Sequence, residues 1–208
     1  MQIQGQVGQP SAQSIQPGAQ PLVRLGQLSD VIVSELHGRY YEQGYRKTSF
    51  GAANQAAVAT TAAFATTYTG LVLYNPNGSA VNLVVQKFGA APILAQTTTL
   101  ALGLMIGQST TAFSGVTALT PRSKNVGSGV QPVGLVASAA TLPVAPTLDT
   151  VLGYLGTGAT TVDQLLPGLF DIEGSIVLPP GAFVAAYTNA ASVAASLFFS
   201  VGWEEVPV

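Results

Sequence analysis

From residue 69 onward, short apolar runs alternate with clusters of Gly, Pro and Asn, the pattern typical of β-strands joined by turns. About eight strands are expected, and the apolar runs lie at residues 70–74, 80–88, 97–106, 112–119, 130–137, 147–155, 171–178, 182–187 and 192–204. Strands at this spacing predict an antiparallel β-sandwich or a barrel. The strongly apolar last strand is expected to be central, because an exposed edge of that kind would aggregate.

Turn residues punctuate these runs at two places. Asn75, Pro76 and Gly78 predict a turn, with Pro76 second and Gly78 fourth, from which 80–88 returns beside 70–74. Pro180 and Gly181 predict a link into the strand at 182–187, and Trp203 falls in the closing strand. The uncharged, Ala- and Thr-rich stretch 52–67 favours an irregular or extended segment, since its threonines oppose a helix.

The first 47 residues differ from the rest. Residues 1–23 carry no charge and contain seven Gln and three Pro, so they cannot form a packed core. Either a disordered tail or an extended arm on a neighbouring subunit fits, and the lack of charge favours the arm. The sequence therefore predicts an arm and polar segment at 1–47 and a β-sandwich domain at 48–208.

Residues 24–47 hold seven of the sixteen charged residues of the chain. Either a short helix or a strand is compatible with residues 30–45. A mixed-charge segment rich in Tyr and Arg is typical of interface hot spots, although a solvated amphipathic element fits as well. The candidate interface residues are Arg24, Arg39, Tyr40, Tyr41, Tyr45 and Arg46.

Only 8% of the residues are charged, against about 25% in an ordinary soluble domain. The surface must therefore be rich in uncharged polar groups, or buried against other chains. A net charge of -2 argues against a nucleic-acid partner. No apolar run approaches the roughly 20 residues of a membrane span, and the absence of Cys excludes thiolate metal sites.

Catalytic chemistry has little support. His37 is the only histidine, and no nucleophile motif accompanies it. Asp171 and Glu173 would share a face of a strand, and with Asp149 or Asp163 they could bind Ca²⁺ or act as a glycosidase pair, although a solvated face is the default. Glu204 and Glu205 fit a solubilising chain end. We expect no enzyme activity and no cofactor.

Several stretches resemble virion structural proteins of tailed bacteriophages. They are SELHGRYYE at 34–42, Phe50, TGLVLYNPNGS at 69–79, LPPG at 178–181 and WEEVP at 203–207. The resemblance implies a β-sandwich, specifically a jelly roll, in a capsid shell or tail. Head decoration proteins of this kind commonly assemble as trimers.

We therefore expect a non-enzymatic capsid decoration (cement) protein, made in the host cytoplasm and located on the capsid surface. Its expected partners are two further copies of itself in a homotrimer and the major capsid protein. The alternative is a tail- or fibre-associated module that binds a receptor or carbohydrate through residues such as Tyr154, Asp171 and Glu173. An enzyme such as a depolymerase is the third and weakest hypothesis.

Overall fold

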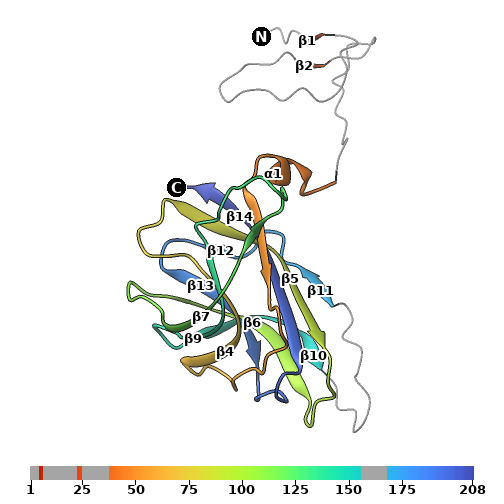
Figure 1. The fold of residues 1–208 in the computed structure, drawn as a ribbon, viewed down its shortest axis with the longest axis vertical. Coiled ribbons are helices and arrows are strands. Elements are labelled where there is room, and N and C mark those ends of the chain that lie inside the picture. The colour runs from red at the N-terminus through yellow and green to blue at the C-terminus, as the bar shows by residue number, and fades with distance from the viewer. Residues whose placement is uncertain (1–4, 7–22, 25–37, 156–167) are drawn as a thin grey trace. The chain divides into compact units, whose positions relative to one another are not determined.

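The structure is a computed structural model that describes residues 5–6, 23–24, 38–155 and 168–208 (Figure 1). Contacts between Cα atoms divide the chain into two units, Met1–Arg39 and Tyr40–Val208. In the first unit, β1 (Gly5–Gln6) pairs in parallel with β2 (Val23–Arg24). The rest of the predicted arm and His37 lie outside the described residues, so the arm and the division at residue 47 stay predictions.

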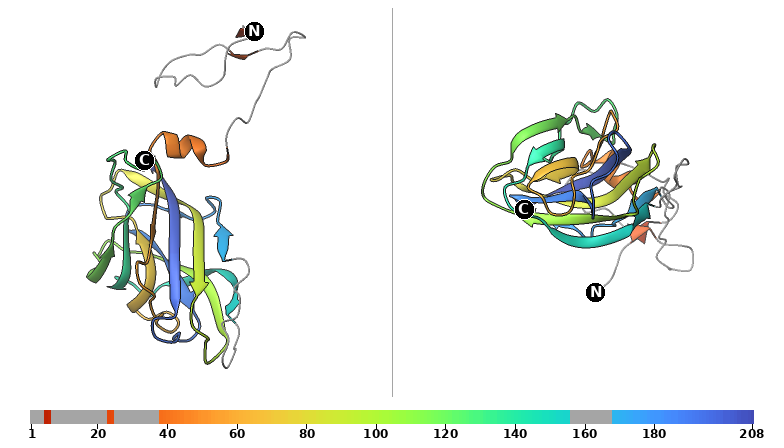
Figure 2. Two further views of the ribbon diagram at one scale, coloured as in Figure 1. Left: turned by 45° about the vertical axis from the view of Figure 1, so that its right-hand side comes forward. Right: turned by 90° about the horizontal axis from the view of Figure 1, so that it is seen from below.

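The second unit contains two antiparallel sheets of six strands each, which confirms the predicted all-β sandwich (Figure 2). The first sheet runs, in spatial order, β10 (Thr147–Leu155), β6 (Leu100–Gln108), β13 (Ala182–Thr188), β4 (Thr67–Tyr74), β9 (Leu135–Thr141) and β7 (Ser114–Leu119). The second runs β11 (Leu169–Asp171), β5 (Val81–Pro92), β14 (Leu197–Pro207), β3 (Ser49–Ala53) and β8 (Arg122–Ser123), and β12 (Val177–Leu178) also pairs with β5. As predicted, the closing strand β14 is central, between β5 and β3.

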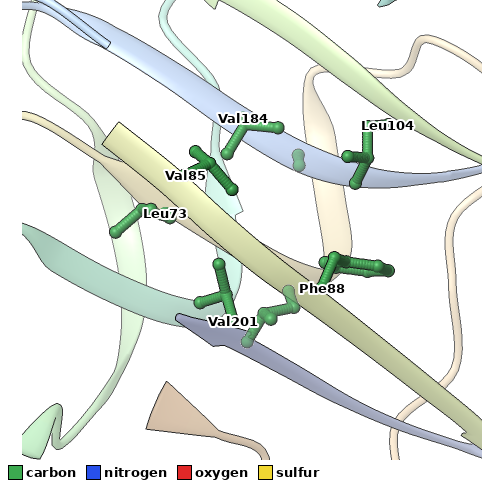
Figure 3. Close-up of a pocket in the computed structure, with 8 residues that line it drawn as sticks. Leu73, Val85, Phe88, Leu104, Val184 and Val201 are labelled. Atoms are coloured by element: carbon green, nitrogen blue, oxygen red, sulfur yellow. The ribbon is translucent and has the colours of Figure 1, made fainter. Parts of the chain in front are cut away.

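The core lies between the two sheets, where inward-facing residues of both meet. Leu73, Leu104 and Val184 of the first sheet face Val85 and Phe88 of the second, together with Val201 (Figure 3). They surround an apolar cavity of only about 10 Å³, which is at the lower size limit for one water molecule and offers it no polar partner. The core is therefore close-packed around this cavity.

Two predicted strands exist but do not pair as expected. The runs at 70–74 and 80–88 form β4 and β5, yet β4 belongs to the first sheet and β5 to the second. The prediction of a hairpin was wrong because both strands are buried on their inward faces, so the chain crosses the sandwich between them instead of turning back. Local patterning identified the strands and could not identify their partners.

The predicted strand at 171–178 is also wrong in detail. It splits into β11 and β12, because Glu173 and Gly174 adopt positive φ angles of 57° and 81° and form a turn between them. The short strand β3 (Ser49–Ala53) was missed altogether, since its last two residues belong to the Ala- and Thr-rich stretch. The expected irregular segment follows it and is confirmed between β3 and β4, apart from an isolated bridge at Val58.

Candidate interface surfaces

The candidate interface residues at 40–46 lie on and beside α1 (Tyr41–Tyr45), immediately before β3. Tyr41 and Tyr45 occupy successive turns and stack with ring centroids 6.1 Å apart, and their side chains are about half exposed, at 47% and 52%. Arg46 Nε lies 2.6 Å from Glu42 Oε1 in an exposed ion pair. Tyr and Arg are among the residue types that contribute most to the binding energy of protein interfaces, and here two exposed, stacked Tyr rings lie beside an Arg.

The helix is attached to the sandwich through its flanks. Lys87 Nζ of β5 lies 4.8 Å from the centroid of the Tyr40 ring, a cation–π contact. On the other side, Thr48 Oγ1 donates to the backbone oxygen of Gln43 and to Glu204 Oε1, each at 3.3 Å. Arg39 is exposed in the turn before the helix. Arg24 belongs to β2, and its side chain lies outside the described residues, so its interface role stays a prediction.

The turn residues gather at one end of the sandwich, where two crossings between the sheets meet. Asn75 N donates to the oxygen of Ala182, and Gly181 N donates to the oxygen of Asn75, both at 2.9 Å. The Asn75 side chain is buried, and its Nδ2 donates to the oxygens of Val81 at 2.7 Å and Leu178 at 2.9 Å. Asn75 therefore ties three segments of both sheets together, which is a structural role.

The first turn is displaced by one residue from its predicted position. Ser79 N donates to the oxygen of Pro76, so the hydrogen-bonded turn covers residues 76–79 and Gly78 is its third residue, with φ of 75°. Asn75 precedes this turn because its backbone N–H and C=O groups bond to Ala182 and Gly181, while its Oδ1 accepts from Ser79 Oγ at 2.5 Å. The second turn matches expectation, since Ala182 N donates to the oxygen of Pro179 with Pro180 and Gly181 at the central positions.

Trp203 is fully buried at the same end and contacts Phe50 with ring centroids 6.1 Å apart. Its Nε1 donates to Glu205 Oε1, and the carboxylate of Glu205 also accepts from the backbone N–H groups of Val133 and Gly134 at 2.8–3.1 Å. Glu205 is only 8% exposed. The expectation of a solubilising chain end was therefore wrong for Glu205, whose inward-facing position in β14 decides its burial.

The outward face of the second sheet carries a groove that sequence reasoning missed. It has a volume of about 640 Å³. One row of paired residues crosses it: Lys87 pairs with Gly202, Gly202 with Gly51, and Gly51 with Arg122. Two cations thus lie at the ends of a floor made of two glycines. The sequence contained one sign of this groove, Gly202 inside the apolar closing strand. The residues that lie beside Gly202 depend on the pairing of distant strands, which the sequence did not reveal.

The residues considered for chemistry are dispersed. Asp171 lies on β11, 3.6 Å from Lys87 Nζ, whereas Glu173 lies in the following turn, so they do not share a strand face. Tyr154 is on β10 of the other sheet and is 72% exposed. The described ranges contain no group of three His, Asp or Glu residues arranged to hold a metal ion. Asp163 is outside these ranges.

No protein-family model and no curated protein matches this chain. Among solved structures, a chain from "Israeli acute paralysis virus heated to 63 degree - full particle" matches with 10% sequence identity, over 96% of this chain and 82% of that one. The TM-score of 0.25 is too low for a shared fold to follow from it. Within the part that the structure describes, no helix is long and apolar enough to cross a membrane.

Proposed function

We propose that this protein is a non-enzymatic structural subunit of a viral particle, and more specifically a capsid decoration (cement) protein built on a jelly roll. The observation that carries the proposal is the strand pairing. Eight strands, β3, β4, β5, β6, β10, β11, β13 and β14, form four nested antiparallel pairs: β3 with β14, β4 with β13, β5 with β11, and β6 with β10. Four nested pairs are what a long hairpin folded over on itself would give, and this supports a jelly roll.

The order within each sheet supports the same topology. Strands β3, β14, β5 and β11 are neighbours in one sheet, and β4, β13, β6 and β10 are neighbours in the other. The segment β7–β8–β9 is then an insertion between the fourth and fifth strands of the pattern. Jelly rolls occur in viral capsid proteins and in lectin domains, so the topology narrows the function without choosing between these two.

Charge and exposed side chains favour the shell. Only 8% of the residues are charged, against about 25% in an ordinary soluble domain. Much of the surface is therefore made of uncharged groups, which can be buried against other chains. The stacked pair Tyr41 and Tyr45 on α1 supplies an exposed aromatic contact of the kind that subunit interfaces bury. Repeated over a lattice, individually weak contacts of this kind gain avidity through effective concentration.

Sedimentation analysis of the purified chain tests the proposal. We expect a trimer, three times the chain mass of 21.2 kDa, and we expect Tyr41→Ser with Tyr45→Ser to shift it toward monomer. Tyr154→Ser is the matched control, because Tyr154 is exposed but lies on β10, away from α1 in sequence and sheet. If the wild-type protein is a monomer at high concentration, the proposed homotrimer is wrong.

A second experiment compares the protein in the assembled particle with the isolated chain. We expect residues 1–47 to be cut by protease much more slowly in the assembled particle than in the isolated chain, because the arm would lie on neighbouring subunits. Equal cleavage rates in both would overturn the role of the arm.

The alternative function is a carbohydrate- or receptor-binding virion module. Its support is the 72% exposed ring of Tyr154, since exposed aromatic faces stack on ligands with a flat apolar face. Asp171 and Glu173 give this alternative less support. Asp171 is paired with Lys87, and Glu173 lies in a turn outside any strand. Binding to a glycan array that Tyr154→Ser abolishes, with the trimer intact, would favour this alternative over the cement role.

A further inference from the structure

We propose that the groove on the outward face of the second sheet binds an extended peptide segment of a protein partner through two carboxylates spaced four residues apart. The groove is defined by the row Lys87–Gly202–Gly51–Arg122 together with Lys124 and Gln86. The proposal stands whether or not the protein belongs to a shell, because it rests on the groove alone.

Packing does not require a glycine at position 202 in the floor of the groove. Gly202 has an ordinary φ, and a Cβ there would meet only the oxygen of Phe50 at 3.8 Å and Lys87 Cβ at 3.9 Å, both ordinary contacts. At Gly51 the space is tighter, since a Cβ would lie 2.5 and 2.7 Å from Nζ and Cε of the flexible Lys124 side chain and 3.2 Å from the oxygen of Val201. Glycine inside a strand weakens it and often marks close approach by a ligand.

Two of the three cations around the groove, Arg122 and Lys124, have no carboxylate partner among the described residues, whereas Lys87 is paired with Asp171. Lys87 faces Asp171 at 3.6 Å, and Glu204, the other carboxylate on this face, accepts from Thr48 Oγ1. No Asp or Glu lines the groove itself. In a chain with only seven Lys and Arg, three of them around one groove make it the natural place for an anion.

One amide side chain lies beside these cations. Gln86 lines the groove and is 7% exposed. Its Oε1 accepts from Ser49 Oγ at 3.2 Å, which orients the amide. A carbonyl or carboxylate oxygen of a peptide in the groove would accept from its Nε2.

The dimensions favour an extended peptide. Three strand spacings separate Lys87 from Arg122, which is about 14 Å at the usual 4.7–4.9 Å per spacing. An extended segment rises about 3.3 Å per residue and alternates its side chains between two faces. Residues i and i+4 of such a segment therefore share one face and lie about 13 Å apart, so their carboxylates reach both ends of the row.

The groove fits other anionic polymers less well. Sugar rings need a free aromatic face, and the Tyr40 ring that lines the groove already carries the ammonium of Lys87. A nucleic acid needs a long basic track, and the net charge of -2 offers none beyond these three cations. Carboxylates on a protein segment match both the small number of cations and their separation.

The test uses the full chain and labelled Gly/Ser peptides of about twelve residues in a fluorescence anisotropy titration at low salt. The probes carry Glu at i and i+4, Glu at i and i+3, or Gln at i and i+4. We expect the first to bind at least threefold tighter than the second, whose carboxylates point to opposite faces, and the Gln peptide to bind weakest. A factor of about three is what one exposed ion pair contributes.

Variants of the protein localise the binding. Arg122→Gln with Lys124→Gln should weaken the best peptide at least about threefold, because it removes the cations that one carboxylate contacts, and Gly202→Val should weaken it by filling the floor. Lys47→Gln is the matched control, an exposed cation that does not line the groove, and should leave the affinity within twofold. Unchanged circular dichroism and melting temperature show that the variants fold.

Three results would overturn the proposal. They are equal binding of the Glu and Gln peptides, retention of binding in Arg122→Gln with Lys124→Gln, and tighter binding of a sulfated oligosaccharide or an oligonucleotide through the same residues. Absence of binding by every peptide up to 1 mM (roughly -4 kcal/mol) would also overturn it. None of these outcomes bears on the native mass, so failure here is distinguishable from failure of the proposed shell function.

Discussion

Two polar regions of the sandwich contrast in how their hydrogen-bonding groups are used. At the end where the sheets cross, Asn75 and Glu205 are buried and make several hydrogen bonds each. In the groove, the cations of Arg122 and Lys124 form no ion pair with a carboxylate among the described residues. Buried polar groups that hold a fold are satisfied internally, so the difference separates a structural region from one available to a partner.

Glu205 gives the sharpest test of the structural region. We expect Glu205→Ala to lower the free energy of unfolding by about 4 kcal/mol, because it leaves the N–H groups of Gly134 and Trp203 buried without an acceptor and removes the acceptor of Val133 N. Denaturant unfolding measures the change. The neighbouring Glu204→Ala should cost below about 1 kcal/mol, and an equally large loss there would contradict the contrast.

Gly181 and Gly78 form a matched pair at the same end. Both have positive φ, 82° and 75°, so alanine is strained at each. A Cβ at Gly181 would also collide with Asn77 Oδ1 and lie 2.6 Å from the oxygen of Ser109, whereas nothing lies within 4 Å at Gly78. We expect Gly78→Ala to cost about 1 kcal/mol and Gly181→Ala about 3 kcal/mol in thermal unfolding. Equal costs would show that the segments of Asn77 and Ser109 move away from Gly181 easily enough to admit a methyl group.

Tyr68 tests whether buried polar groups elsewhere in the sandwich also find all their hydrogen-bond partners within the protein. Its hydroxyl lies 2.9 Å from the oxygen of Leu71 and 3.0 Å from that of Ala186, and it accepts from Leu71 N. Burial raises the pKa of Tyr68 far above its ordinary value of 10.0, more than the two backbone hydrogen bonds lower it. The folded state therefore retains a proton that the unfolded state loses above pH 10.

Stability should accordingly fall as the pH rises above about 10, by up to about 1.4 kcal/mol per pH unit from this group. Tyr68→Phe removes the ionisation and should flatten that part of the profile relative to wild type. Chemical denaturation between pH 8 and 11 measures both. Parallel profiles for the two proteins would mean that the Tyr68 hydroxyl is accessible to water.

The smallest effects are expected in the groove. Gly202→Val should leave the free energy of unfolding unchanged or raise it by about 0.5 kcal/mol, because the strand gains a residue of higher β-propensity whose Cβ makes only ordinary contacts. Arg122→Gln should change it by less than about 0.5 kcal/mol. Destabilisation by more than 2 kcal/mol in either variant would give the groove a structural role and remove the contrast.

The alternation of apolar residues with turn residues was enough to predict an all-β sandwich, most of its strands and the central place of the closing strand. These features follow from local periodicity and from the cost of exposing an apolar edge, both of which are written in neighbouring residues. The stacked pair Tyr41 and Tyr45 was also within reach, since a spacing of four residues places two side chains together once a helix forms.

Pairing between distant strands lies beyond local patterning. The crossing from β4 to β5, the burial of Glu205 and the row Lys87–Gly202–Gly51–Arg122 all depend on which strands become neighbours and in which register. Several pairings satisfy the same apolar pattern, and the packing of the whole core selects one. The residues that now define the groove come from β5, β14, β3 and β8, and they meet only because that selection brings them to one face.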